Sequence, residues 1–112
     1  MLKFTSIGDV TEIKFDNIHN LNMLISDSVK KELKKLFEKQ YEKVLINMEN
    51  ITFIDSSGFA ALLSVTNFAQ KNSGQVIFCN VSDSAMELFQ ILQLHTIFTI
   101  VGDKQEALKL FK

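Results

Sequence analysis

The sequence contains no proline and no tryptophan, and it has a single cysteine and four glycines. One cysteine cannot form an internal disulfide, and beside two separated histidines it makes a poor set of metal ligands. No run of about 18 apolar residues is present, so no membrane-spanning helix is predicted. We therefore expect a protein of a reducing, cytoplasmic compartment that holds no metal and no other cofactor.

Arginine is absent as well, since all 12 basic residues are lysine and the formal net charge is −1. The chain therefore lacks the bidentate group that commonly binds phosphate or guanine. A near-neutral charge also argues against binding by phosphate neutralisation. These features predict neither a nucleic-acid nor a membrane partner.

Residues that could support catalysis are scattered. The glycines lie far apart, so no phosphate-cradling loop of the Rossmann or Walker type is present. Cys79 sits in an apolar run without a visible base, and neither His19 nor His95 has a serine or carboxylate partner by spacing. We therefore expect a protein that is not an enzyme.

A chain of 112 residues, of which 46% are apolar, is expected to form one globular domain over 1–112. Alternation of apolar and polar residues around Gly8 and Asp9 predicts a β-hairpin over 2–7 and 13–15. Residues 17–22 are polar and predicted to be a loop. Short apolar runs predict strands over 44–48, 76–79 and 97–101, and a further apolar patch covers 51–54.

Apolar residues at helical spacing predict the helices. The first begins at an N-cap, Ser26 or Asp27, and runs to about Gln40, and the second covers 57–72 before the Ser73–Gly74 stop. A third is capped by Ser82 or Ser84, the latter with Glu87 at capping-box spacing, and a last helix follows Asp103, with Glu106 again at cap spacing. The order β-β-α-β-α-β-α-β-α predicts the α/β class, with helices packed on a mixed sheet.

The most unusual segment ends an apolar stretch with Asp55-Ser56-Ser57-Gly58 at the start of a helix. Free backbone N–H groups and the positive end of the helix dipole favour an anion there, so a serine could carry a phosphate. Gly58 leaves the backbone open to an approaching protein. The alternative is that Asp55 or a serine simply caps the helix, because these residue types are preferred caps.

No charged residue lies between Asp55 and Lys71. A helix on the protein surface normally carries a charged outer face. Apolar residues from Phe59 to Phe68 do not fit one narrow stripe. Either both faces of this helix are buried within the domain, or one end binds a partner.

The Ile54–Phe59 segment follows the strand Val44–Met48 and precedes Gly74–Cys79, and in this order it resembles the STAS domain, above all the bacterial anti-sigma factor antagonists. The resemblance covers nearly the whole chain and implies the STAS fold. It implies that Ser56, directly after the aspartate, is phosphorylated by a partner that is both anti-sigma factor and serine kinase. The unphosphorylated protein would bind that partner and release the sigma factor, and a PP2C-type phosphatase would reset the switch.

The resemblance also implies roles for neighbouring residues. Asp55, Ser57 and Gly58 would shape the acceptor loop, and Phe59 stands where the family commonly has leucine. The family uses an aspartate before the first helix, and Asn22 takes that position here. These residues are the expected partner-binding set.

Two alternatives remain open. The chain could be a non-switching STAS scaffold subunit of a stressosome or of a lipid-transporter complex. Asn22, which stands in place of the family's aspartate, favours this alternative. It could also be a receiver-like phosphoacceptor that uses Asp55 and Lys104, although the acidic pair that holds magnesium in receivers is missing.

Overall fold

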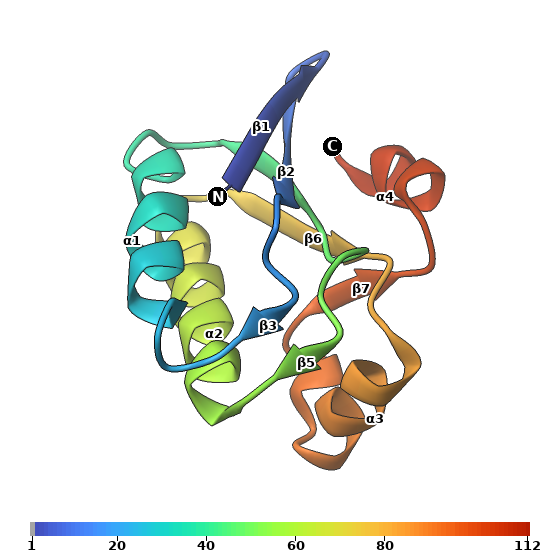
Figure 1. The fold of residues 1–112 in the computed structure, drawn as a ribbon. Coiled ribbons are helices and arrows are strands. Elements are labelled where there is room, and N and C mark those ends of the chain that lie inside the picture. The colour runs from blue at the N-terminus through green and yellow to red at the C-terminus, as the bar shows by residue number, and fades with distance from the viewer. Residues whose placement is uncertain (1) are drawn as a thin grey trace.

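The computed structural model describes residues 2–112, so Met1 of the expected 1–112 domain lies outside the described residues. Five strands form the main sheet in the order β1-β2-β4-β6-β7 (Figure 1). Their bounds are Leu2–Ile7, Val10–Phe15, Lys43–Asn47, Gln75–Cys79 and Thr99–Val101. β1 pairs antiparallel with β2 across a turn at Gly8, and the other pairs are parallel. The predicted mixed sheet is confirmed.

The helices cover both faces of this sheet (Figure 1). They are α1 (Ser26–Leu36), α2 (Ser56–Lys71), α3 (Asp83–Ile91), the 3-10 helix η1 (Leu94–Thr96) and α4 (Lys104–Leu110). The first three share the larger core with one face, and Ala107 of α4 packs on the other face. Among residues 2–112, no helix combines the length and the apolar character needed to cross a membrane.

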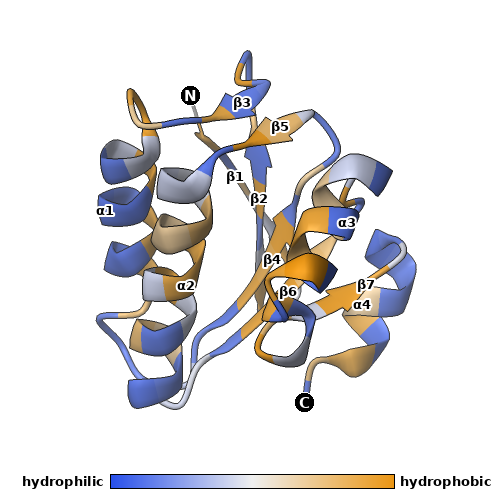
Figure 2. Cartoon of the chain, turned by 90° about the horizontal axis from the view of Figure 1, so that it is seen from below, coloured by the Kyte–Doolittle hydropathy of each residue, from blue (hydrophilic) through white to orange (hydrophobic). Residues whose placement is uncertain are grey.

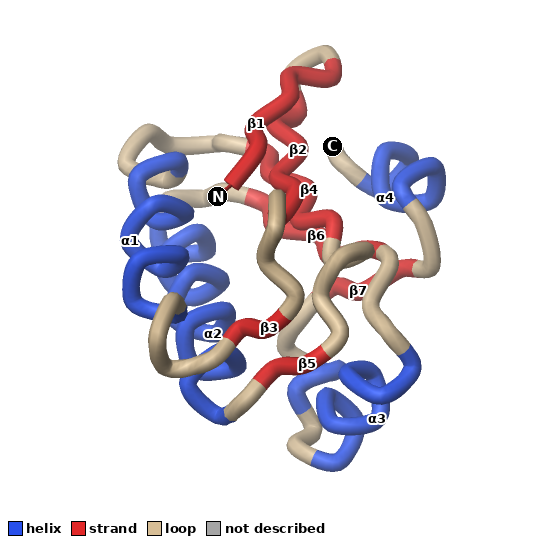
Figure 3. Tube along the Cα trace, in the orientation of Figure 1, coloured by secondary structure: helices blue, strands red, loops and turns tan. Residues whose placement is uncertain are grey.

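Two strands of two residues each form a second, small parallel sheet (Figure 3). β3 (Asn20–Leu21) pairs with β5 (Phe53–Ile54). The prediction that 17–22 is entirely loop is therefore wrong. A two-residue strand in a polar segment carries no periodicity from which it could be predicted. This small sheet holds the segments before α1 and α2 side by side.

Aromatic rings connect α2, α3 and the sheet. The centroid of the Phe89 ring on α3 lies 4.9 Å from that of Phe59 and 5.3 Å from that of Phe98. The centroids of Phe98 and of Phe78 on β6 are 5.1 Å apart. All three pairs have edge-to-face geometry, which is favourable because the positive edge of one ring meets the negative face of the other. The start of α2 is thus fixed against α3 from inside.

Helix α1 differs from its prediction at both ends. Its N-cap is Ile25, with no side-chain cap, because the Ser26 hydroxyl donates instead to the carbonyl of Asn22 at 2.7 Å. The helix ends at Leu36 rather than near Gln40. The next residue, Phe37, is fully buried, and the chain then reverses through Tyr41 with a positive φ of 66°.

The remaining caps are resolved by the structure. Ser82, not Ser84, caps α3 by accepting from the Ala85 amide, and Ser84 lies inside the helix. Asp103 caps α4 through the amide of Glu106, as its spacing predicts. Neighbouring serines are equally suitable N-caps by residue type, so the sequence does not distinguish them and the path of the chain decides which one caps the helix.

Candidate functional site

The site begins at the first turn of α2, at the same end of the molecule as β3 and β5 (Figure 1). Asp55 is the N-cap of this helix, and its Oδ1 accepts from the Gly58 amide at 3.0 Å. Its Oδ2 accepts from the Met23 amide at 3.1 Å, on the segment before α1. One carboxylate therefore caps the helix and ties two loops together.

The two serines of the motif have different surroundings. Ser57 is partly buried, and its hydroxyl donates to Asp55 Oδ1 at 2.5 Å and lies 3.3 Å from the Ser26 hydroxyl. Ser56 is exposed, and its hydroxyl has no hydrogen-bond partner within residues 2–112. Only Ser56 presents a free hydroxyl to solvent at the positive end of α2.

Hydrogen bonds hold the pKa of Asp55 below its ordinary value of 3.8. The largest contribution comes from the Ser57 hydroxyl, followed by the Gly58 amide, and the Met23 amide adds to it. Each of these donors stabilises the ionised carboxylate. Asp55 therefore carries a full negative charge at neutral pH, next to Ser56.

Gly58 permits a close approach between the two loops. A Cβ atom at this position would lie 2.5 Å from the carbonyl oxygen of Leu21 and 2.7 Å from Cγ2 of Ile54. Both distances are far below van der Waals contact, and the first involves backbone. Glycine is therefore required for α2 to start directly against β3 and β5.

Asn22 shapes the loop between β3 and α1. Its Oδ1 accepts from the Leu24 amide at 3.1 Å, and its backbone carbonyl accepts from the amides of Ile25 and Ser26. The first is the side-chain-to-backbone bond of an Asx turn. Asn22 thus orients the loop whose next residue, Met23, binds Asp55.

Three large apolar side chains are exposed on the segments that meet before α1 and α2. Met23, Leu24 and Phe53 are 76%, 86% and 53% exposed, and we call them the acceptor-end surface. Helix α3, which is largely hydrophobic (Figure 2), contacts β5. Leu88 and Ile91 of α3 and its C-cap Leu92 are exposed. Exposed apolar groups that gather at one end of a small domain mark an interaction site.

Helix α2, which carries no charge before Lys71, buries one face within the domain. Phe59, Leu62 and Val65 face the core, and Phe68 is partly covered by α1, whose Lys34 ammonium lies 5.6 Å from its ring. The opposite face is exposed at Ser56, Ala60 and Asn67, so the predicted burial of both faces is wrong, and a partner at one end of the helix stays a prediction. Because the Phe59 ring is buried, it acts on the site by positioning α2 and α3.

The structure does not bring together the groups that a receiver-like site needs. The Lys104 ammonium pairs with the buried Glu12 carboxylate at 3.2 Å, whereas Asp55 is occupied by its helix and by Met23. Burial raises the pKa of the Cys79 thiol to about 11, which removes it as a nucleophile. Within residues 2–112, no three metal-binding side chains gather.

Sequence reasoning found Asp55, Ser56, Ser57 and Gly58 but missed the acceptor-end surface. The sequence did contain an indication of this surface, because Met23 and Leu24 are two adjacent apolar residues in a polar, asparagine-rich segment. Exposure of these side chains follows from the path of the loop, which the sequence pattern does not contain.

Comparison with known proteins places these features in a family. The model of the STAS domain family matches residues 9–107. The anti-sigma F factor antagonist of Paenibacillus polymyxa is 25% identical over 84 residues, which cover 74% of this chain and 72% of that protein.

Two solved structures share the fold. An anti-sigma-factor antagonist (STAS) domain protein from Planctomyces limnophilus has a TM-score of 0.85, at 23% identity over 98% of this chain and 97% of that one. The Bacillus cell fate determinant SpoIIAA in its phosphorylated form has a TM-score of 0.70, at 16% identity, and each chain is covered over its full length. The chain therefore belongs to the STAS domain family, and within it resembles the anti-sigma factor antagonists.

Proposed function

We propose that this protein is a phosphorylation-controlled anti-sigma factor antagonist that acts by binding rather than by catalysis, in the cytoplasm. Its unphosphorylated form binds an anti-sigma factor that is also a serine kinase, and this releases the sigma factor. The observation that carries the proposal is the free, exposed hydroxyl of Ser56 at the start of α2, next to the acceptor-end surface. The family membership and the relative named as an anti-sigma F factor antagonist support it.

Ser56 is the proposed phosphoacceptor because a kinase needs a hydroxyl that it can reach. Ser57 lacks this property, since its hydroxyl already donates to Asp55 and is partly buried. That SpoIIAA, a structural neighbour, exists in a phosphorylated form supports a modification of this fold.

Charge explains how phosphorylation would switch binding off. A phosphate on Ser56 adds roughly −1.5 to −2 charges beside the ionised Asp55. The dipole of α2 offsets part of this charge within the domain, so the fold persists. A partner that covers Met23, Leu24 and Phe53 would have to desolvate the phosphate, which weakens binding.

Asn22 and Gly58 have supporting roles in this proposal. Asn22 orients the loop that presents Met23 and Leu24, and Gly58 allows that loop to lie against α2. Asn22 supplies no charge where the family has an aspartate, so contact with the partner would rest on hydrogen bonding. A PP2C-type phosphatase would return the protein to its binding form.

The proposal is tested by co-expressing the chain with the candidate anti-sigma kinases of its host, adding ATP and locating phosphate by peptide mass spectrometry. We expect one ATP-dependent phosphate on Ser56, with loss of co-elution with the kinase. Ser56→Ala should remain bound in ATP, Ser56→Asp should bind weakly, and Ser57→Ala serves as the matched control that still switches.

Two results would argue against it. A stable complex without phosphate on any serine favours the non-switching scaffold, and points to Asn22 as the position where the switch was lost. Binding of Ser56→Asp as tight as that of the unmodified protein would refute the charge mechanism.

A further inference from the structure

In the described part of the chain, one edge of the main sheet lies open, and this is the outer side of β1. β1 pairs with β2 over all of its residues without a bulge, and no other backbone hydrogen bond within residues 2–112 involves it. Residues 3–6 are exposed. Figure 1 shows this strand at the opposite end of the molecule from β3, β5 and the start of α2. The open edge is therefore separate from the acceptor loop.

The turn after β1 determines which of its backbone groups point outward. Ile7 and Val10 are partners across a two-residue turn in which Gly8 has a φ of 60°. A hydrogen bond joins the residues that close such a turn, and bonded and non-bonded pairs then alternate along an antiparallel ladder. The odd-numbered residues of β1 therefore direct their N–H and C=O groups to β2. The even-numbered residues direct theirs outward, and these are Leu2, Phe4 and Ser6.

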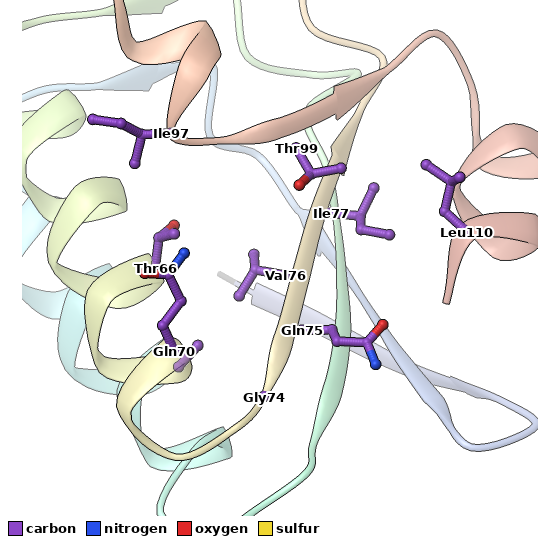
Figure 4. Close-up of a pocket in the computed structure, with 10 residues that line it drawn as sticks. Thr66, Gln70, Gly74, Gln75, Val76, Ile77, Ile97, Thr99 and Leu110 are labelled. Carbon is purple, nitrogen blue, oxygen red and sulfur yellow. The ribbon is translucent and has the colours of Figure 1, made fainter. Parts of the chain in front are cut away.

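The other edge of the sheet is protected. β7 has only three residues, and it pairs with β6 only from Ile77, opposite Thr99. Figure 4 shows side chains of α2 on one side of the unpaired start of β6 and Leu110 of α4 on the other. The Gln75 side chain there accepts from the Lys112 amide at 3.2 Å. Short strands and covering segments are common ways in which proteins prevent pairing at an edge.

β1 has little protection of this kind. It is six residues long and regular, and Lys3 is its single charged residue. Proline, which would remove an outward N–H group, is absent from the whole chain. A long, regular edge strand with few charges favours pairing with another strand.

The side chain of Phe4 lies at the margin of the larger core. It stands opposite Ile13 of β2, which is fully buried in that core, and it lies on the same face as Leu2. Phe4 itself is 47% exposed, so its outer side has no cover. A strand added beside β1 would bury this ring.

The edge is complementary to a second copy of itself. Two antiparallel β1 strands can be related by a twofold axis that places Phe4 opposite Phe4 of the second copy. Leu2 then stands opposite Ser6, so every outward backbone group of one strand meets one of the other. Lys3 stands opposite Thr5, so no like charges meet, whereas a shift that placed Lys3 opposite itself would bring two ammonium groups together. Aromatic cross-strand pairs stabilise a sheet and like charges destabilise it.

We propose that two copies of this chain associate through β1, with the strands antiparallel and Phe4 opposite Phe4, so that the two main sheets become continuous. Pairing along one strand buries less surface than a standard stable interface, so we expect a reversible dimer with a dissociation constant on the order of 100 µM. Both acceptor loops stay accessible, because they lie at the far ends of the dimer from the axis (Figure 1). The association is independent of the proposed phosphorylation switch.

Sedimentation equilibrium of the full chain, from about 10 µM to about 1 mM, measures the association. In two-dimensional NMR, the amide signals of Leu2, Phe4 and Ser6 should shift with protein concentration. Ser6→Pro removes an outward N–H group and leaves the ladder with β2 intact. Because the change is repeated in both copies, we expect it to raise the dissociation constant roughly 10-fold or more. Ser6→Ala, which keeps that N–H group, is the matched control and should associate like the unmodified protein.

Phe4→Lys gives a second test that needs no proline. It places two ammonium groups opposite each other and should also abolish association over this concentration range. Its matched control is Ile91→Lys, which changes an exposed apolar residue of α3 and should associate normally. Ser56→Asp should associate normally as well, which separates this test from that of the switch.

Three results would overturn the proposal. The first is a chain that stays monomeric up to about 1 mM, where a dimer of the expected affinity would predominate. The second is association that Ser6→Pro and Phe4→Lys leave unchanged. The third is association that Ile91→Lys abolishes, which would place the interface on α3.

Discussion

The hydroxyl of Ser57 donates to the carboxylate of Asp55 at 2.5 Å, within the same turn of chain. This bond divides the two adjacent serines into one with a structural partner and one that is free. It also places the negative charge of Asp55 on the helix side of the loop, where the amides of Gly58 and Met23 complete its hydrogen bonds. The two serines are the same residue type in the motif, but their hydroxyls have different surroundings in the structure.

The difference between the serines predicts different stabilities of their alanine variants. Ser57→Ala removes a hydrogen bond to a charged group and should lower the melting temperature by roughly 4 °C. Ser56→Ala removes no bond within residues 2–112 and should melt within error of the unmodified protein. Calorimetry of the three proteins at neutral pH measures this. Equal melting temperatures for the two variants would contradict the assignment of the hydrogen bond.

Gly58→Ala reverses a general rule about helices. Alanine within a helix is normally more stable than glycine by roughly 0.5–1 kcal/mol. Here the new Cβ would meet the Leu21 carbonyl at 2.5 Å, so we expect a net loss of about 1–3 kcal/mol in urea unfolding. The control is Ala60→Gly, on the exposed face of α2, which should cost about 1 kcal/mol by helix propensity alone. A Gly58→Ala variant that is more stable than the unmodified protein would disprove the close approach.

Most of the fold could be predicted from the sequence, because the apolar runs of β4 and β6 and the alternation of the hairpin are unambiguous. β3 was missed, since two residues carry no periodicity. The end of α1 was missed because Phe37 continues the helical spacing of apolar residues, although in the structure it is the C-cap that ends the helix. Local patterns thus predict elements, while their ends depend on packing.

The candidate site was predicted in part for a similar reason. Asp55 to Gly58 form an unusual Asp-Ser-Ser-Gly segment between an apolar stretch and a helix, so their residue types alone mark them as a candidate site. The roles of Met23 and Leu24 depend on a loop path set by the Asp55 carboxylate and the Asn22 carbonyl. A contact between segments more than 30 residues apart cannot be deduced from one sequence.

The lowered pKa of Asp55 predicts an acid-side transition in the acceptor loop. Because the native pKa lies below 3.8, this carboxylate stabilises the fold above its unfolded pKa, and that stabilisation is lost as the pH falls through the native value. Protonation should weaken the bonds from Gly58 and Met23, so we expect their amide chemical shifts to titrate together, with a midpoint below 3.8. Two-dimensional NMR at decreasing pH measures this midpoint. Asp55→Asn should abolish the transition, and a midpoint at or above 3.8 would show that the hydrogen bonds do not favour the ionised form.

The buried carboxylate of Glu12 predicts that Lys104 matters for stability far from the acceptor loop. Glu12 is 2% exposed and accepts from Lys104 Nζ at 3.2 Å and from Asn47 Nδ2 at 3.1 Å. Lys104→Met would leave a buried charge with one neutral partner, and we expect a loss of about 2 kcal/mol in urea unfolding, reduced from a fully buried pair because Lys104 is partly exposed.

Two further variants separate the loss of the pair from the loss of a lysine. Lys43→Met removes the exposed ion pair with Asp9 and should unfold within error of the unmodified protein. Adding Glu12→Gln to Lys104→Met removes the unpaired charge and should recover part of the lost stability, since a neutral amide is less costly to bury. If the double variant is no more stable than Lys104→Met, the cost arises from lost packing of the lysine chain and not from the unpaired charge of Glu12.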